Sequence, residues 1–247
     1  MNLPLIRPTS REALLVWVLH RFAEEFNERA ILKGGLLLRL LDSPRDTNDA
    51  DFVFAPYRSK RQIAPRVKAI LEEIDDAEVD VRLHSTMLRA AIRVDGVGVQ
   101  VGCSVADECR SIAMTTASMA EANGYPPRVV RAMDLSVALA HKLAAWNERR
   151  LVRDLYDAYF FVARVGVSPD MPTLEERLSK MRSNRPELKR VRSMTIAAFS
   201  RALEAALANL TDRAIDEELG GLIPAASRAG LSLQIRAALN GLLQTLE

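Results

Sequence analysis

The first part of the chain alternates between helical and extended hydrophobic spacing. Apolar residues recur at helical intervals over residues 11–29, which predicts an amphipathic helix capped by the hydroxyl of Ser10 or Thr9. A short apolar run over residues 30–32 leads into Lys33-Gly34-Gly35, and a second helical run follows over residues 36–41. This order places the glycine pair at the start of the second helix.

β-forming residues dominate the next part of the chain. Residues 50–55 predict a strand, and residues 57–74 have helical spacing, with Pro65 marking either a kink or a late start. Asp95-Gly96 is a strong signal for a two-residue hairpin turn. That turn joins the last two of three further predicted strands, which cover residues 78–84, 88–94 and 97–103.

The composition changes after residues 124–127 (G-Y-P-P), the clearest linker in the chain. From Val129 onward the spacing is helical, apart from breaks at residues 166–172 and 220–224. Strands gathered in the first half and helices in the second are typical of the α+β class. We therefore expect an α/β lobe over residues 1–124 and a helical lobe over residues 125–247.

Charge and cysteine content narrow the class of protein. The chain has 34 basic and 32 acidic residues, so only local clusters could favour a nucleic-acid partner. Two cysteines are too few for a disulfide framework, and no apolar run approaches the ~20 residues of a membrane span. The N-terminus has no apolar core typical of a signal peptide. We expect a cytoplasmic protein without a membrane partner.

Two carboxylates and the glycine pair form the first group with candidate chemistry. If residues 49–53 are extended, Asp49 and Asp51 point to one face, where they repel unless a divalent cation lies between them. The backbone N–H groups of Gly34 and Gly35 form a candidate phosphate site. Metal-assisted phosphoryl or nucleotidyl transfer requires such a combination. The alternative is an ordinary glycine turn and a solvated acidic strand end.

A second group of charged residues lies in the helical half. On one continuous helix, Lys142, Arg149, Arg153 and Asp157 fall on a single stripe. The lysine as a point charge and the arginines as forked donors could hold a triphosphate. The alternative is a set of surface ion pairs one helical turn apart, such as Arg153 with Asp157.

Three motifs occur in order between Ile31 and about Phe161: K-G-G, R-x-T-x-D-x-D-F and K-L-x-A-x-x-x-R-x-x-x-R-D-L-Y-D. Their succession resembles the AbiEii-type nucleotidyltransferases, toxins of type IV toxin–antitoxin and phage-defence systems in the polymerase-β-like superfamily. The resemblance implies a small mixed sheet with flanking helices, then a helical lobe, with the nucleotide between them. It also implies nucleotide transfer from an NTP to an acceptor, for some relatives the 3′ end of tRNA, and a winged-helix antitoxin as partner.

The same resemblance implies roles for individual residues. Asp49 and Asp51 would bind Mg²⁺, and Lys142 would contact the triphosphate. Asp154, with Asp157, would complete the site, so the expected catalytic residues are Asp49, Asp51, Lys142 and Asp154. The expected nucleotide-binding residues are Lys33, Gly34, Gly35, Thr47, Lys142, Arg149, Arg153 and Asp157.

Gly102 is a departure from the wider superfamily. Many polymerase-β-like enzymes carry a third carboxylate on a neighbouring strand, and here its expected position is a glycine. Either Asp154 supplies the missing charge or the site is weaker. Two other classes therefore stay open: a degenerate module that only binds nucleotide or RNA, and an NTP-dependent phosphotransferase.

A basic run over residues 177–192 carries seven basic residues and a single acidic one, Glu187. A solvated helix face is the ordinary meaning of such a run. In an enzyme that modifies RNA, it would contact the phosphate backbone. The three histidines, His20, His84 and His141, have no spacing that indicates a metal site.

Overall fold

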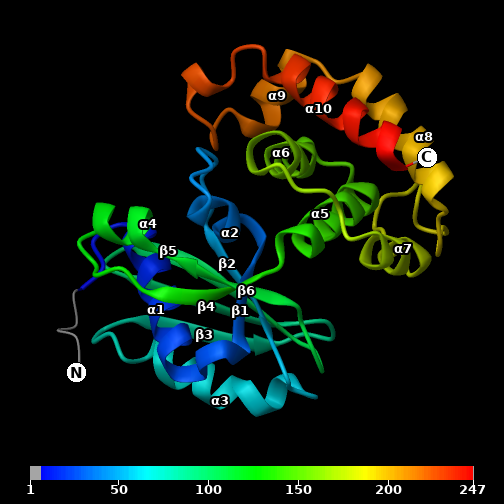
Figure 1. The fold of residues 1–247 in the computed structure, drawn as a ribbon. Helices are drawn as coiled ribbons and strands as arrows, with labels where there is room; N and C mark the ends of the chain where they lie inside the picture. Colours follow the sequence, from blue (N-terminus) through cyan, green and yellow to red (C-terminus); the bar gives the residue numbers. More distant parts are fainter. Residues whose placement is uncertain (1–6, 247) are drawn as a thin grey trace. The chain divides into compact units, whose positions relative to one another are not determined.

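The computed structural model describes residues 7–246, which fall into two compact units (Figure 1). The first unit ends at Asp134 and the second begins at Leu135, a later division than the predicted one at residue 124. The reason is strand β7 (Val129–Met133), which pairs with the sheet of the first unit. The prediction of helix from Val129 onward is therefore wrong for this segment.

The first unit is built on a seven-stranded mixed sheet with the order β3-β4-β5-β2-β1-β7-β6. The central strand β2 pairs antiparallel with β1 and parallel with β5. This mixed sheet with flanking helices confirms the predicted fold class. The remaining strands are β1 (Ala30–Lys33), β2 (Asp49–Phe54), β3 (Glu78–Leu83), β4 (Leu88–Val94), β5 (Val97–Val105) and β6 (Ser111–Thr115).

Helices cover the two faces of this sheet unequally. Helix α1 (Arg11–Phe26) packs Phe22 against Phe52 and Phe54, with ring centroids 5.0 and 5.8 Å apart. Its neighbour α3 (Lys60–Leu71) is linked to it by the Arg66–Glu25 ion pair, and Glu73, just after α3, binds Arg21. Figure 1 shows α2 (Gly34–Leu40) on the side of the sheet opposite α3, and α4 (Ala117–Ala122) precedes β7.

Local sequence signals explain several of these boundaries. Of the two predicted caps, Ser10 and Thr9, it is Ser10 that caps α1, by accepting a hydrogen bond from the Ala13 N–H. Asp95 and Gly96 both have left-handed φ angles, 49° and 80°, which two-residue hairpin turns of this type require. Pro65 lies inside α3, so it does not mark a late start of this helix.

The second unit is helical. Its core includes Trp146 and Phe199, whose rings meet edge to face with centroids 5.8 Å apart. The helices are α5 (Leu135–Arg149), α6 (Val152–Phe160), α7 (Met171–Ser179), α8 (Ile196–Ala208), α9 (Asp212–Leu219) and α10 (Leu231–Leu246). Within residues 7–246 no helix combines the length and the apolar character needed to cross a membrane.

The single continuous helix predicted through residues 142–157 is wrong. The chain leaves the helical path at Arg150, whose φ is 56°, and α6 begins two residues later. The Arg150 guanidinium stacks over the Trp146 ring at 4.3 Å, and the Glu218 carboxylate accepts a hydrogen bond of 2.8 Å from the Val152 N–H. These contacts stabilise the break, because the first holds Arg150 against α5 and the second gives a free backbone N–H at the start of α6 a hydrogen-bond acceptor.

Candidate active site

The acidic pair lies on the face of β2 that points away from the aromatic core. Ala50, Phe52 and Phe54 are buried on the core face, whereas Asp49 is exposed and Asp51 is half-buried on the other face. The alternation of an extended strand thus gives both carboxylates a common direction. Within the described part of the chain, no cation forms an ion pair with Asp51.

Two glycines make room for the Asp51 carboxylate. A Cβ atom at Gly34 would lie 2.8 Å from Asp51 Oδ2, and a Cβ atom at Gly102 would lie 2.2 Å from Asp51 Oδ1. Gly102 is the direct partner of Asp51 in the β2–β5 pairing, which explains this close approach. A carboxylate at residue 102 would displace Asp51 from this position, so the glycine there leaves room for the Asp51 carboxylate.

The start of α2 brings two further motif residues beside the glycine pair. A Cβ atom at Gly35 would lie 2.8 Å from Arg45 Nη2 and 2.9 Å from Thr47 Oγ1. Thr47 Oγ1 also accepts a hydrogen bond of 3.2 Å from the Asp49 N–H. Thr47 is therefore fixed between the glycine pair and the acidic strand. Sequence reasoning did not single out Arg45, although the R-x-T spacing contains it.

Lys33 lies opposite Asp51 in the antiparallel β1–β2 pairing. Its ammonium donates a hydrogen bond of 3.2 Å to Ser104 Oγ, and that hydroxyl donates in turn to the Phe52 carbonyl at 3.1 Å. Ser104 was also missed from the sequence. The available signal was its position two residues after Gly102, on the same face of β5.

The acidic pair suits Mg²⁺ better than a metal held only by protein. Among residues 7–246, no group of three or more histidine, cysteine or acidic side chains is placed to hold a metal ion. Mg²⁺ is usually held by one or two carboxylates together with substrate phosphates and water. Asp49 and Asp51, exposed and half-buried beside two glycines, fit this chemistry.

The helical unit contains two ion pairs whose carboxylates are buried, although the side chain of Arg149 is 48% exposed. Lys142 Nζ lies 2.5 Å from Asp157 Oδ2, and their side chains are 14% and 2% exposed. Arg149 binds Asp154 with two hydrogen bonds, of 2.6 Å from Nη2 to Oδ1 and 3.1 Å from Nε to Oδ2. Burial raises the pKa of the Asp154 carboxyl, and the charges of Arg149 and Lys142 oppose this effect.

Ion pairs within the helical unit thus engage Lys142, Arg149 and Asp157 of the predicted charged stripe. Both oxygens of Asp154 accept from Arg149, so this carboxylate orients a cation within its own unit. The proposed surface pair between Arg153 and Asp157 is absent, since Arg153 is exposed while Asp157 is buried and binds Lys142. The predicted residues therefore gather into two groups, one in each unit.

The basic run at residues 177–192 is mostly an irregular loop after α7, and not a helix face. Ser183 Oγ donates to the Glu148 carbonyl at 2.6 Å, and Arg185 Nη1 donates to the Arg149 carbonyl at 3.2 Å. The loop is thus attached to the end of α5. It surrounds a hollow of about 630 Å³, whose lining includes the basic side chains of Lys180, Arg182, Lys189 and Arg192.

Comparisons with known proteins concern the fold and the family of the chain. No curated protein sequence matches the chain. Among solved structures, MenT4, a nucleotidyltransferase toxin from Mycobacterium tuberculosis H37Rv, is similar with a TM-score of 0.61 and 19% identity, over 96% of this chain and 85% of that one. JHP933 from Helicobacter pylori is similar with a TM-score of 0.55 and 15% identity, over 96% of this chain and 91% of that one.

These two structures share the fold, and a family model extends the likeness to the sequence. The model that describes the nucleotidyl transferase AbiEii toxin of type IV toxin–antitoxin systems matches residues 17–240. This range contains the acidic pair, both glycines beside Asp51 and the two ion pairs with buried carboxylates in the helical unit. The chain belongs to the AbiEii family of nucleotidyltransferase toxins.

Proposed function

We propose that this toxin-family enzyme transfers a nucleoside monophosphate from an NTP to an RNA hydroxyl, such as the tRNA 3′ end, and that Mg²⁺ is required. The observation that carries the proposal is the Asp51 carboxylate, which lies in a space made by Gly34 and Gly102 and shares its face with Asp49. Among residues 7–246 no ion pair neutralises this carboxylate, which supports its proposed role in holding a cation.

Mg²⁺ bound by Asp49 and Asp51 would supply positive charge to the reacting phosphate. The backbone of Gly34 and Gly35 can approach the NTP phosphates closely, since neither residue carries a side chain there. Lys33 and Thr47 border the same place. Their roles as nucleotide-binding residues remain part of the proposal.

Lys142 and Arg149 would bind the triphosphate. Their partners Asp157 and Asp154 hold the two cations in fixed positions, which lowers the entropy lost when the phosphates bind. In this proposal Asp154 and Asp157 are positioning residues, and Arg153 is an exposed cation that can add to the phosphate contacts.

The reaction balances without any further reagent. The acceptor hydroxyl oxygen forms a bond to the α-phosphorus, and the bond from that phosphorus to the bridging oxygen of the β-phosphate breaks. Pyrophosphate leaves with the bonding electrons, and the hydroxyl proton is released to solvent or to a basic group. Positive charge from Lys142 stabilises the leaving pyrophosphate, and this stabilisation is largest in the transition state.

The basic loop supports RNA as the acceptor. Lys180, Arg177 and Arg185 are engaged by Glu176, Glu148 and Glu187, whereas Arg182, Lys189 and Arg190 have no acidic partner among the described residues. Unpaired cations around a hollow are typical of phosphate-backbone contacts. The type IV toxin family also implies an antitoxin partner, for which we propose the winged-helix protein associated with such toxins.

Labelled nucleotides test the proposal. We expect the purified chain with Mg²⁺ and total RNA to transfer label from an α-labelled NTP into tRNA, and no label from a γ-labelled NTP. Label from the γ position alone would show a phosphotransferase. NTP binding without transfer to RNA would show a binding module.

A further inference from the structure

One face of the sheet is open over β3, β4 and β5. The first unit places α1 and α3 against the other face, where Leu88, Ile92 and Val101 are buried. On the open face the side chains of β4 and β5 are exposed or very small. Its residues are Glu78, Asp80 and Arg82 on β3, Arg89, Ala91 and Arg93 on β4, and Gly98, Gln100 and Gly102 on β5.

The strand register joins this open face to the acidic pair. Arg89 is paired with Gly102, and Gly102 is paired with Asp51, so the three lie in one row across the sheet. Because neighbouring strands are about 4.8 Å apart, the backbone of Arg89 lies about 10 Å from that of Asp51. In the next row, Gln100 is paired with Asp49. The open face is therefore a continuation of the candidate active site.

The charge on the open face is mainly positive. Arg82 forms an ion pair of 2.8 Å with Asp80, which removes both charges from the balance and leaves Arg89 and Arg93 against Glu78. Neither Arg89 nor Arg93 has an ion-pair or hydrogen-bond partner among residues 7–246. Glu78 is the remaining acidic side chain on these three strands.

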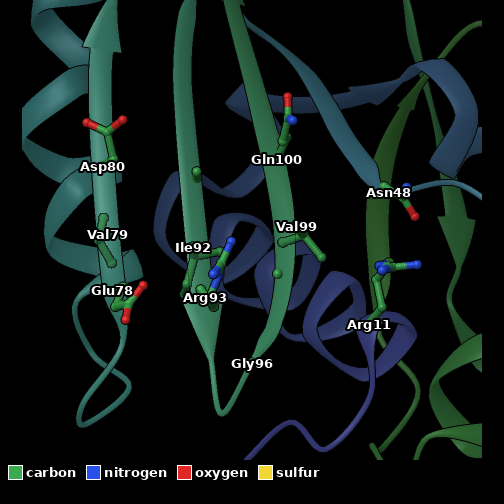
Figure 2. Close-up of a pocket in the computed structure, with 12 residues that line it drawn as sticks. Arg11, Asn48, Glu78, Val79, Asp80, Ile92, Arg93, Gly96, Val99 and Gln100 are labelled. Atoms are coloured by element: carbon green, nitrogen blue, oxygen red, sulfur yellow. The ribbon is translucent and has the colours of Figure 1, made fainter.

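A hollow of about 580 Å³ lies on these strands, and its lining includes Gln100, the strand partner of Asp49, but neither Asp49 nor Asp51. Figure 2 shows Asp80, Arg93 and Gln100 on three neighbouring strands, with Gly96 at the β4–β5 turn. Ala91 and Gly98, which also line the hollow, have small or no side chains and leave room for a ligand. Arg11 and Asn48 add a guanidinium and an amide to the lining. A volume of this size is sufficient for a small organic group such as one nucleotide.

We infer that the open face of β3–β4–β5 is the acceptor surface, and that it holds the single-stranded 3′ end of an RNA. This inference rests on the proposed nucleotidyl transfer. The attacking and leaving oxygens lie on opposite sides of the phosphorus in phosphoryl transfer. Since β1 and β5 flank β2, a triphosphate held at the β1 side, by Gly34 and Gly35, leaves the β5 side for the acceptor.

The chemistry of the surface fits a single strand better than a duplex. Arg89 and Arg93 can bind two backbone phosphates, while the amides of Gln100 and Asn48 can hydrogen-bond to a base edge. No aromatic residue occurs on this face of the three strands, so affinity comes from phosphate contacts and not from stacking.

The test combines binding and transfer with one pair of substitutions. In the full chain, Arg89→Gln/Arg93→Gln should weaken binding of a short fluorescent single-stranded RNA at least tenfold. It should also reduce the log–log salt slope by about 1.4, because each lost contact to a single strand removes about 0.7. The dissociation constant for NTP should not change, and Arg89→Lys/Arg93→Lys should retain most of the RNA affinity.

Arg61→Gln is the matched control. Arg61 is an exposed arginine on α3, the helix that packs on the opposite, covered face of the sheet, and its side chain has no partner among the described residues. Photo-crosslinking from a 3′-terminal 4-thiouridine should label a peptide within residues 88–105. Unchanged RNA affinity and salt slope in the Gln pair would overturn the inference, even if wild-type protein transfers α-label. RNA binding that depends on Arg89 and Arg93 without any α-label transfer would overturn the proposed function and leave an RNA-binding surface.

Discussion

The acidic residues of the sheet unit and those of the helical unit occupy opposite environments. Asp49 is exposed and Asp51 half-buried, and within the described chain Asp51 has no ion pair. Asp154 and Asp157 are each 1% exposed, and each binds a cation at hydrogen-bond distance. D-x-D and D-x-x-D look alike as sequence patterns. From this difference in burial we propose that the first pair binds a ligand and that the second pair positions protein cations.

The largest effect is expected at the exposed pair. Asp51→Asn should raise the activation free energy of nucleotide transfer by several kcal/mol, because one of the two carboxylates that would bind Mg²⁺ is lost. The transfer rate should then fall roughly a thousandfold. The same change should leave the free energy of unfolding equal or higher, since it removes repulsion from Asp49. Initial rates with α-labelled NTP and denaturant unfolding measure the two quantities. An Asp51→Asn variant with wild-type activity at saturating Mg²⁺ would contradict this assignment.

The ion pairs with buried carboxylates in the helical unit should behave differently: their disruption should lower the free energy of unfolding as well as the transfer activity. Asp157→Asn leaves the Lys142 ammonium buried without a counter-charge, which should cost about 3–5 kcal/mol in unfolding free energy. The double change Lys142→Met/Asp157→Leu should restore most of the stability, because a buried ion pair can be replaced by apolar packing. Chemical denaturation measures both variants.

Transfer activity then separates positioning from packing. We expect the Lys142→Met/Asp157→Leu protein to be folded but slow, with a raised KM for NTP, because the triphosphate contact is gone. Full activity in this double variant would show that Lys142 and Asp157 serve the fold alone.

A steric comparison on β5 should give a smaller effect. A Cβ atom at Gly102 would lie 2.2 Å from Asp51 Oδ1, whereas one at Gly98 would lie 3.6 Å from the nearest atom, the Ile92 carbonyl oxygen. Gly102→Ala should therefore lower transfer roughly tenfold or more by displacing Asp51, and Gly98→Ala, which adds one methyl group to the proposed acceptor surface without reaching Asp51, should lower it much less. Equal activities of the two variants would show that the room beside Asp51 is unimportant.

The smallest effect concerns pH and lies far from the acidic pair. His20 is buried against Thr116, with 2.8 Å between Nε2 and Oγ1, and burial lowers its pKa to about 4. Above pH 6.5 the ring is neutral in both folded and unfolded chains. As the pH falls toward 4, only the unfolded chain gains the proton, so stability declines by up to about 3 kcal/mol.

His20→Gln should flatten this part of the stability profile, as measured by urea unfolding at a series of pH values. The same slope in wild type and variant would assign the acid sensitivity to other groups.

Local patterns predicted the elements that local chemistry determines. Ser10, the glycine pair and the Asp95-Gly96 turn each act within a few residues, and the structure places them as expected. Strand β7 was missed because Val129–Met133 becomes a strand by pairing with β1 and β6, which are distant in sequence. The break at Arg150 was missed for a similar reason, since Glu218 caps α6 from another helix.

The candidate site shows the same limit. The sequence predicted that Asp49 and Asp51 share a face, because strand geometry alone decides this. It could not predict that Gly102 lies against Asp51, which depends on the β2–β5 register. Nor could it predict that Asp157 would turn toward Lys142, since that contact depends on the break between α5 and α6.

The most direct test of the contrast between the two acidic pairs is the binding of Mn²⁺, in place of Mg²⁺, measured by electron paramagnetic resonance in the presence of a saturating non-hydrolysable NTP. We expect wild-type protein to bind Mn²⁺, Asp51→Asn to weaken this binding at least tenfold, and the stable Lys142→Met/Asp157→Leu variant to retain it once the nucleotide concentration is raised to saturation. Unchanged Mn²⁺ binding in Asp51→Asn, or its loss only in the Lys142→Met/Asp157→Leu protein, would contradict the assignment of the metal to the exposed pair.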